Sequence, residues 1–228
     1  MDQSIAGFVS DAPRRFRREW ALTVLWPSLG CGGVAAALVR NDLRLEDGTF
    51  IFLLGMPALY WFMVGLLQGR LLGALVSRPL AWAACTWGGG SLALIGGFAT
   101  FGALTVLIDL VSTAGYDFGH PFALAPFGVS GVVAGAILGL CQALTLRANR
   151  GERGRWILNS ASAGALAFLV LWVGVNAITF ISGPGLFELA PSLFFAAIAA
   201  FLLAGALLHN FLTGIALQRL LARRGSFL

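Results

Sequence analysis

Six long apolar segments, joined by short polar connections, run through this chain of 228 residues. Each segment has 20 residues or more, which is about the length that an α-helix needs to cross the hydrocarbon core of a bilayer. The segments are residues 20–39, 49–68, 82–111, 121–146, 156–182 and 191–217. The sequence therefore predicts an all-α polytopic integral membrane protein with six transmembrane helices.

Composition agrees with a membrane location. Hydrophobic residues make up 58% of the chain, charged residues 11%, and the mean hydropathy is +0.86, whereas soluble domains carry about 25% charged residues. Every basic residue is an arginine, which excludes reactions that need a Schiff-base or P-loop lysine. Cys31, Cys85 and Cys141 lie in apolar segments and lack metal-binding spacing. We expect buried cysteines and no cofactor.

The arginines predict the orientation of the chain in the membrane. Only Arg40 and Arg44 lie in an outward-facing connection, and the other thirteen of the fifteen fall on one side. The positive-inside rule places that side, with both termini, in the cytoplasm. The net charge of +5 is therefore a topology signal, and we expect no binding of nucleic acid.

Three regions follow from this topology. We expect a cytoplasmic amphipathic segment at residues 1–19, a transmembrane domain at 20–221 and a cytoplasmic tail at 222–228. The stretch "LGLCQALTLR", with Gly-x-x-Gln and Leu-Arg at a helix end, resembles bacterial membrane proteins in a general way. That resemblance implies a bacterial protein but no activity. Together with the arginine distribution, it predicts a location in the bacterial inner membrane with both termini inside.

The spacing of glutamine and tryptophan indicates a repeat. Gln68, Gln142 and Gln218 stand 74 and 76 residues apart, near the inner ends of the even-numbered segments. An arginine shortly before a tryptophan opens each odd-numbered segment; these tryptophans are Trp20, Trp82 and Trp156. We interpret the pattern as three parallel helical hairpins. The alternative is that basic helix ends with tryptophan belts are general features of membrane proteins.

Glycines mark the faces on which we expect helices to touch. The set Gly128, Gly131, Gly135 and Gly139 recurs at intervals of three and four residues, so it forms one helical face for close packing. In the third segment, Gly88, Gly89 and Gly90 belong to a glycine-rich stretch. It favours either close packing or a broken helix that lines a transport path.

The first of these faces also contains the sequence Gly128-Val129-Ser130-Gly131. It resembles the nucleophile motif of the rhomboid intramembrane proteases, which implies Ser130 as nucleophile and His209, on the last segment, as its base. The second segment lacks the histidine and asparagine that rhomboids use for the oxyanion. His209 and Ser130 also differ in depth by roughly 13 Å at 1.5 Å per residue. We therefore predict no enzyme and no catalytic residue, with a rhomboid-like protease as a remote alternative.

Polar residues inside the apolar segments are the remaining candidates for a site. His209 and Asn210 form a polar pair, in which His209 would bond to Gln142 or Asn159 of another helix. The alternative is a site for a proton, a substrate or a tetrapyrrole. Asp109 would reach lipid headgroups or a solute at the outer side, with Asn176 as its partner.

Two classes of function remain. The first is an accessory, structural or assembly subunit of a membrane complex, in which helix packing is the function and the partner is a second membrane protein or a copy of the chain. The second is a small-solute or ion transporter or channel, which would use the intramembrane polar residues.

Overall fold

The computed structural model describes residues 15–20, 22–31, 49–72, 76–111, 124–182 and 191–223. Nearly all of these residues are helical, and no strand occurs among them. The expected all-α class is thereby confirmed. The outer connections, the N-terminal residues before 15 and the tail after 223 lie outside the described part of the chain, and so do the expectations made for them.

The helices fall in the six apolar segments. An N-terminal helical segment covers residues 15–20 and 22–31. The others are α2 (Thr49–Leu72), α3 (Pro79–Val111), α4 (Leu124–Ala143), α5 (Arg150–Ser182) and α7 (Pro191–Arg223). Both α3 and α7 begin at a proline, which suits the first helical position because its missing N–H has no intrahelical partner there.

The start of α5 lies six residues before the predicted one because a capping box precedes the apolar run. The Asn149 side-chain oxygen accepts a hydrogen bond from the Glu152 N–H at 2.9 Å. In return, the Glu152 carboxylate accepts from the Asn149 N–H at 3.0 Å. These two bonds satisfy backbone donors at the helix N-terminus, so a polar first turn extends α5 beyond its apolar part.

Three described helices are long and apolar enough to cross a membrane: α3, α4 and residues Arg150–Ile178 of α5. Large hydrophobic side chains on the outside of the bundle agree with a lipid surrounding, since Ile95 is 64% exposed and Leu158 is 66% exposed. The chain therefore has the character of a membrane-embedded helical protein.

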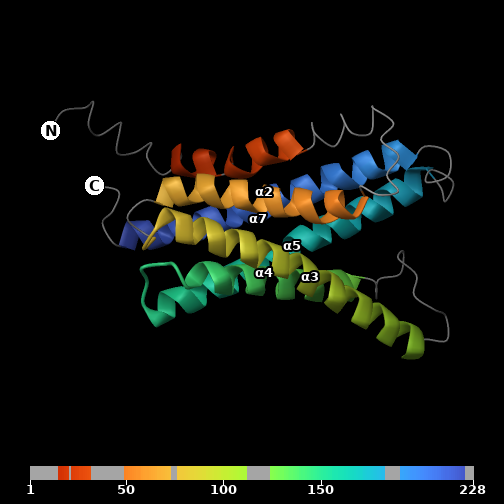
Figure 1. Ribbon diagram of the computed structural model, residues 1–228. Coiled ribbons are helices and arrows are strands. Elements are labelled where there is room, and N and C mark those ends of the chain that lie inside the picture. The colour runs from red at the N-terminus through yellow and green to blue at the C-terminus, as the bar shows by residue number, and fades with distance from the viewer. Residues whose placement is uncertain are drawn as a thin grey trace, which may run out of the picture.

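The helices lie side by side (Figure 1) and pack mainly against their neighbours in the chain, from α2 to α3, α4, α5 and α7. The N-terminal helical segment lies against both α2 and α7: Leu22 shares a groove with Leu67 of α2, and the Trp20 ring contacts Gly214 of α7. The first and last helices are thus in contact, and the bundle closes into a ring.

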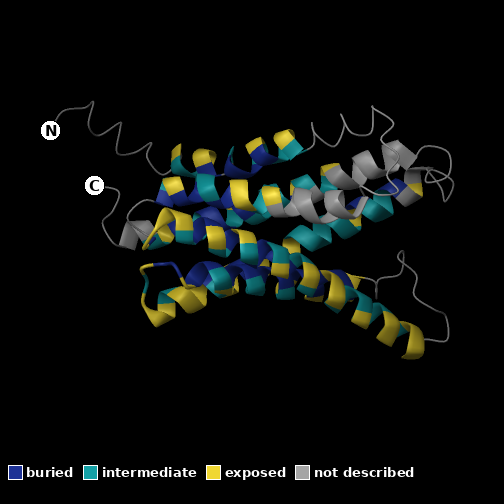
Figure 2. Cartoon of the chain, in the orientation of Figure 1, coloured by how far each residue is buried: buried dark blue, intermediate teal, exposed yellow. Residues whose placement is uncertain are grey.

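The main hydrophobic core lies toward one end of the helical bundle (Figure 2). Three tryptophans, each at most 2% exposed, meet there from the N-terminal helical segment, α3 and α5: Trp20, Trp82 and Trp156. The connections before α3 and before α5 are joined beside them, because the Ser77 N–H donates to the Thr145 carbonyl at 3.1 Å. The core therefore ties the helices together where these connections lie.

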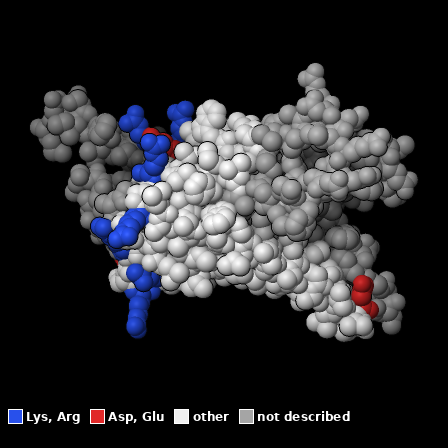
Figure 3. Space-filling model, in the orientation of Figure 1, with Lys and Arg blue, Asp and Glu red and all other residues white. Residues whose placement is uncertain are grey.

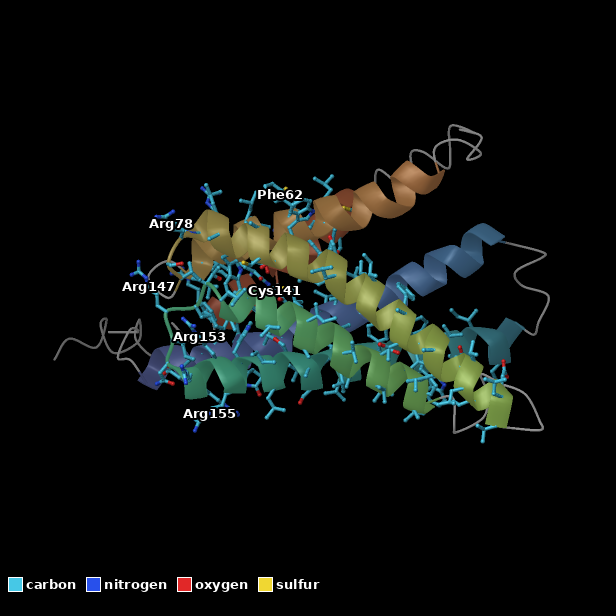
Figure 4. All side chains as sticks on the ribbon, turned by 60° about the horizontal axis from the view of Figure 1, so that its bottom comes forward. Phe62, Arg78, Cys141, Arg147, Arg153 and Arg155 are labelled. Carbon is cyan, nitrogen blue, oxygen red and sulfur yellow. The ribbon has the colours of Figure 1, made fainter. Side chains whose placement is uncertain are left out.

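Positive charge is concentrated at the same end (Figure 3), which we call the basic end. Arg78, Arg147, Arg153 and Arg155 lie there near the connections of α2 with α3 and of α4 with α5 (Figure 4). Asp109 is exposed near the far end of α3. The charge distribution of the described residues is therefore strongly one-sided along the bundle.

Candidate functional site

A hydrogen-bonded cluster of amides joins the N-terminal helical segment, α2, α3 and α7 inside the bundle. Asn210 of α7 is at its centre and is 3% exposed. Its side-chain oxygen accepts a hydrogen bond from the Gln68 amide of α2 at 2.7 Å. Its amide nitrogen donates to the Trp20 carbonyl at 2.5 Å and to the Thr23 hydroxyl at 3.1 Å. One side chain thus connects three helical elements.

The cluster continues through Gln68 into α3. Its amide oxygen accepts a hydrogen bond from the indole N–H of Trp82 at 3.3 Å. Because Gln68 is 3% exposed, both ends of its amide lie away from solvent and both have partners within the protein. We call Asn210, Gln68, Trp82 and Thr23 the amide cluster.

A second buried amide bridges α4 and α3. Gln142 is 4% exposed, and its nitrogen donates to the Thr86 hydroxyl at 3.1 Å. Thr86 is itself completely buried, one helical turn after Trp82. Burial of an amide without a partner costs about 1–3 kcal/mol in proteins, so these bonds fix which helices lie next to each other.

The structure places the predicted site residues in different surroundings. Asn210 and Gln142 are buried and bonded between helices, but to Gln68 and Thr86 rather than to each other. The sequence identifies Gln68 only as part of the repeat. Its spacing of 74 residues from Gln142 is the one sequence feature that pointed to a role for this amide. The ring of His209 takes no part in the bonds that the structure describes. Asn159, its suggested partner, is exposed.

The suggested pair of Asp109 and Asn176 is not joined in the described structure. The Asn176 amide donates to the Trp172 carbonyl of its own helix at 2.9 Å. A side-chain bond to the carbonyl four residues earlier satisfies the amide locally, so it needs no partner on another helix. Asp109 is exposed near the end of α3.

The glycine face of α4 packs against α5. Added Cβ atoms at Gly131 and Gly135 would collide with the carbonyl oxygens of Gly164 and Ser160. At Gly139 the Cβ would approach the Ser160 side chain to 2.7 Å. Gly128 is looser, since the nearest atom to an added Cβ is a methyl carbon of Leu169 at 4.0 Å. Three of the four predicted glycines therefore allow the backbones of α4 and α5 to approach closely.

The glycines of α3 do not form one contact. Gly90 faces the Trp61 ring of α2, whereas a Cβ at Gly89 would lie 2.7 Å from Cys141 of α4. Nothing lies within 4 Å of a Cβ at Gly88. The helix continues unbroken through this stretch to Val111. The alternative of a discontinuous third span is thus wrong, because neighbouring side chains fill the space beside Gly89 and Gly90.

Ser130 is completely buried in α4, and its hydroxyl has no hydrogen-bond partner in the described structure. A nucleophilic serine needs a base within hydrogen-bond reach. His209 lies on α7, which packs mainly against α5, whereas α4 packs mainly against α3 and α5. Among the described residues, Ser130 therefore has no base within hydrogen-bond reach.

Metal-ligating residues are not grouped in the described part of the chain: no three histidine, cysteine or acidic side chains gather there. Cys31, Cys85 and Cys141 are free thiols of intermediate burial, not the fully buried residues that the sequence suggested.

Comparison with known proteins adds no assignment. The chain matches no protein-family model, no curated protein and no solved structure.

Proposed function

We propose that this chain is a non-enzymatic integral membrane protein that acts as an accessory, structural or assembly subunit of a larger membrane complex. One observation carries the proposal: the side chains of the amide cluster form their hydrogen bonds inside the bundle. Its donors and acceptors bond to one another or to backbone across neighbouring helices, so its polarity stabilises the packing of the bundle.

The glycine contacts support the same proposal. Close approach of α4 and α5 at Gly131 and Gly135 gives a stiff interface, because small residues let two backbones pack without intervening side chains. Transport by alternating access would need helices that separate or break. The continuous α3 and the bonded amides offer no described element of that kind.

We further infer that the chain consists of three parallel hairpins. The contact between α2 and α3 and the contact between α4 and α5 use equivalent residues, which stand 74 positions apart in the chain. Gly65 of α2 contacts Ala83 and Thr86 of α3. In the same way, Gly139 of α4 contacts Ile157 and Ser160 of α5. The third junction is related but not identical, since Gly214 of α7 contacts Trp20 itself.

The proposed orientation has the basic end and both termini in the cytoplasm of a bacterial cell, with six spans across the inner membrane. It rests on the positive-inside rule and on the arginines gathered at the basic end (Figure 3). In a chain whose native cysteines are replaced by alanine, a membrane-impermeant maleimide should label Asp109→Cys in intact cells. Arg155→Cys should be labelled only after the cells are opened. The opposite pattern would reverse the orientation.

Native purification tests the subunit role. We expect a tagged chain, extracted in mild detergent, to retain a membrane-protein partner in fixed stoichiometry or to run as an oligomer of itself. The untagged chain, passed over the same resin, controls for nonspecific capture. A chain that runs as a monomer after chemical crosslinking in the native membrane, with no crosslinked partner, would refute the proposal.

A further inference from the structure

A groove opens on the surface of the bundle between the N-terminal helical segment and α2. Its volume is about 260 Å³. Leu22, Thr23 and Trp26 line one wall, and Leu67 and Leu71 line the other. Leu22 and Thr23 stand four and three positions before Trp26, and Leu67 stands four before Leu71, so each set lies on one side of its helix. The groove therefore runs along two helices packed side by side.

The walls of the groove are apolar apart from the indole N–H of Trp26 and the Thr23 hydroxyl, and that hydroxyl is already bonded. Thr23 donates to the Trp20 carbonyl at 2.7 Å and accepts from Asn210 at 3.1 Å. Trp26 stands out from the surface and is 64% exposed. A hydrocarbon chain would bury apolar surface against these walls.

Charged residues lie at the end of the groove nearest the basic end. Glu19 and Arg70 complete its lining, and both are exposed. Arg15, four residues before Glu19, lies on the same face of its helix, so two arginines and one acid stand at this end. Arg70, in the last turn of α2, is exposed where the groove reaches the basic end.

We propose that this groove binds an acidic phospholipid, with an acyl chain along Trp26 and Leu67 and the phosphate at Arg70. Charge complementarity selects this occupant. The apolar walls match the acyl chain, and the guanidinium offers a planar pair of donors to a phosphate. The inference rests on the membrane location of the chain but not on its role as a subunit. It adds a specific lipid site beside the amide cluster, because Thr23 belongs to both.

Native mass spectrometry of the full-length chain in mild detergent tests the site, with phosphatidylglycerol and phosphatidylcholine of identical acyl chains as probes. We expect tighter binding of phosphatidylglycerol. Arg70→Gln should weaken it about tenfold, the size of one charge-assisted hydrogen bond. Arg78→Gln is the matched control, because Arg78 is an exposed arginine of the same end that does not line the groove. It should change the affinity less than twofold.

The acyl part is tested separately. Trp26→Ala should weaken binding of both lipids severalfold, because it removes a large apolar side chain from one wall of the groove. Trp87→Ala is its control, since Trp87 is also an exposed tryptophan but belongs to α3. Both tryptophans are surface residues, so the variants should fold. Equal effects of Arg70→Gln and Arg78→Gln, or of Trp26→Ala and Trp87→Ala, would overturn the proposal. Equal affinity for the two lipids would overturn it as well. A chain that runs alone can still pass this test, which separates it from the subunit proposal.

Discussion

Replacement of Asn210 by leucine should loosen the bundle more than the same change at the adjacent His209. Asn210→Leu removes three hydrogen bonds, one each to Gln68, Trp20 and Thr23. A hydrogen bond between membrane helices contributes about 0.6 kcal/mol on average. Three of them give a loss of about 2 kcal/mol, roughly a thirtyfold change in the folding equilibrium.

The assay is reversible unfolding of the purified chain in mixed detergent micelles, followed by tryptophan fluorescence. His209→Leu is the control, because its ring takes no part in the described bonds, and we expect less than about 0.5 kcal/mol. A double-mutant cycle with Gln68→Leu isolates the bond between the two amides and should give a coupling of about 0.6 kcal/mol or more. Equal stability of the two single variants, together with zero coupling, would refute the role assigned to the amide cluster.

Two further pairs of variants test the packing, and one single variant tests the protease hypothesis. Gly135→Ala should cost about 1–3 kcal/mol, because its methyl group would collide with the Ser160 carbonyl, whereas Gly88→Ala has open space and should be neutral or stabilising in the same unfolding assay. Trp82→Phe should cost about 1 kcal/mol, because it leaves the Gln68 oxygen without a donor. Trp156→Phe should cost less, since its buried indole N–H has no partner, and similar losses in both would contradict the assignment. Ser130→Ala should leave thermal stability unchanged or higher, because the serine hydroxyl is buried and unbonded. The original chain and the variant should both cleave a model membrane substrate only at background. Cleavage by the original chain that Ser130→Ala abolishes would restore the protease hypothesis.

Much of the fold could be predicted from the sequence because hydrophobic length is a strong constraint in a membrane. The predicted third segment, residues 82–111, ends at the same residue as α3. Helix starts were less predictable: α5 begins six residues early because Asn149 and Glu152 cap it, and such caps lie in polar sequence outside the apolar run. Hydropathy reports the part of a helix that suits lipid rather than the whole helix.

The partners of the buried amides could not be predicted in the same way. Spacing indicated that Gln68 and Gln142 were equivalent, yet Gln68 bonds to both α7 and α3, whereas Gln142 bonds to α3 alone among the described residues. Partner choice depends on which helices become neighbours and at what depth, and no local pattern encodes it. The glycines of α4 were predictable because intervals of three and four residues define one face. Gly88, Gly89 and Gly90 are consecutive, so they point about 100° apart and meet different surroundings.

Closure of the ring has a consequence for synthesis of the chain. The bond from Asn210 to the Trp20 carbonyl joins residues 190 positions apart. At about 5–20 residues per second, the ribosome needs on the order of 10–40 s between the two. Throughout that interval the first helix is already made, but the last helix against which it packs does not yet exist. The N-terminal helix therefore completes its packing last although it is translated first, and its contact with α2 is the one that can form before then.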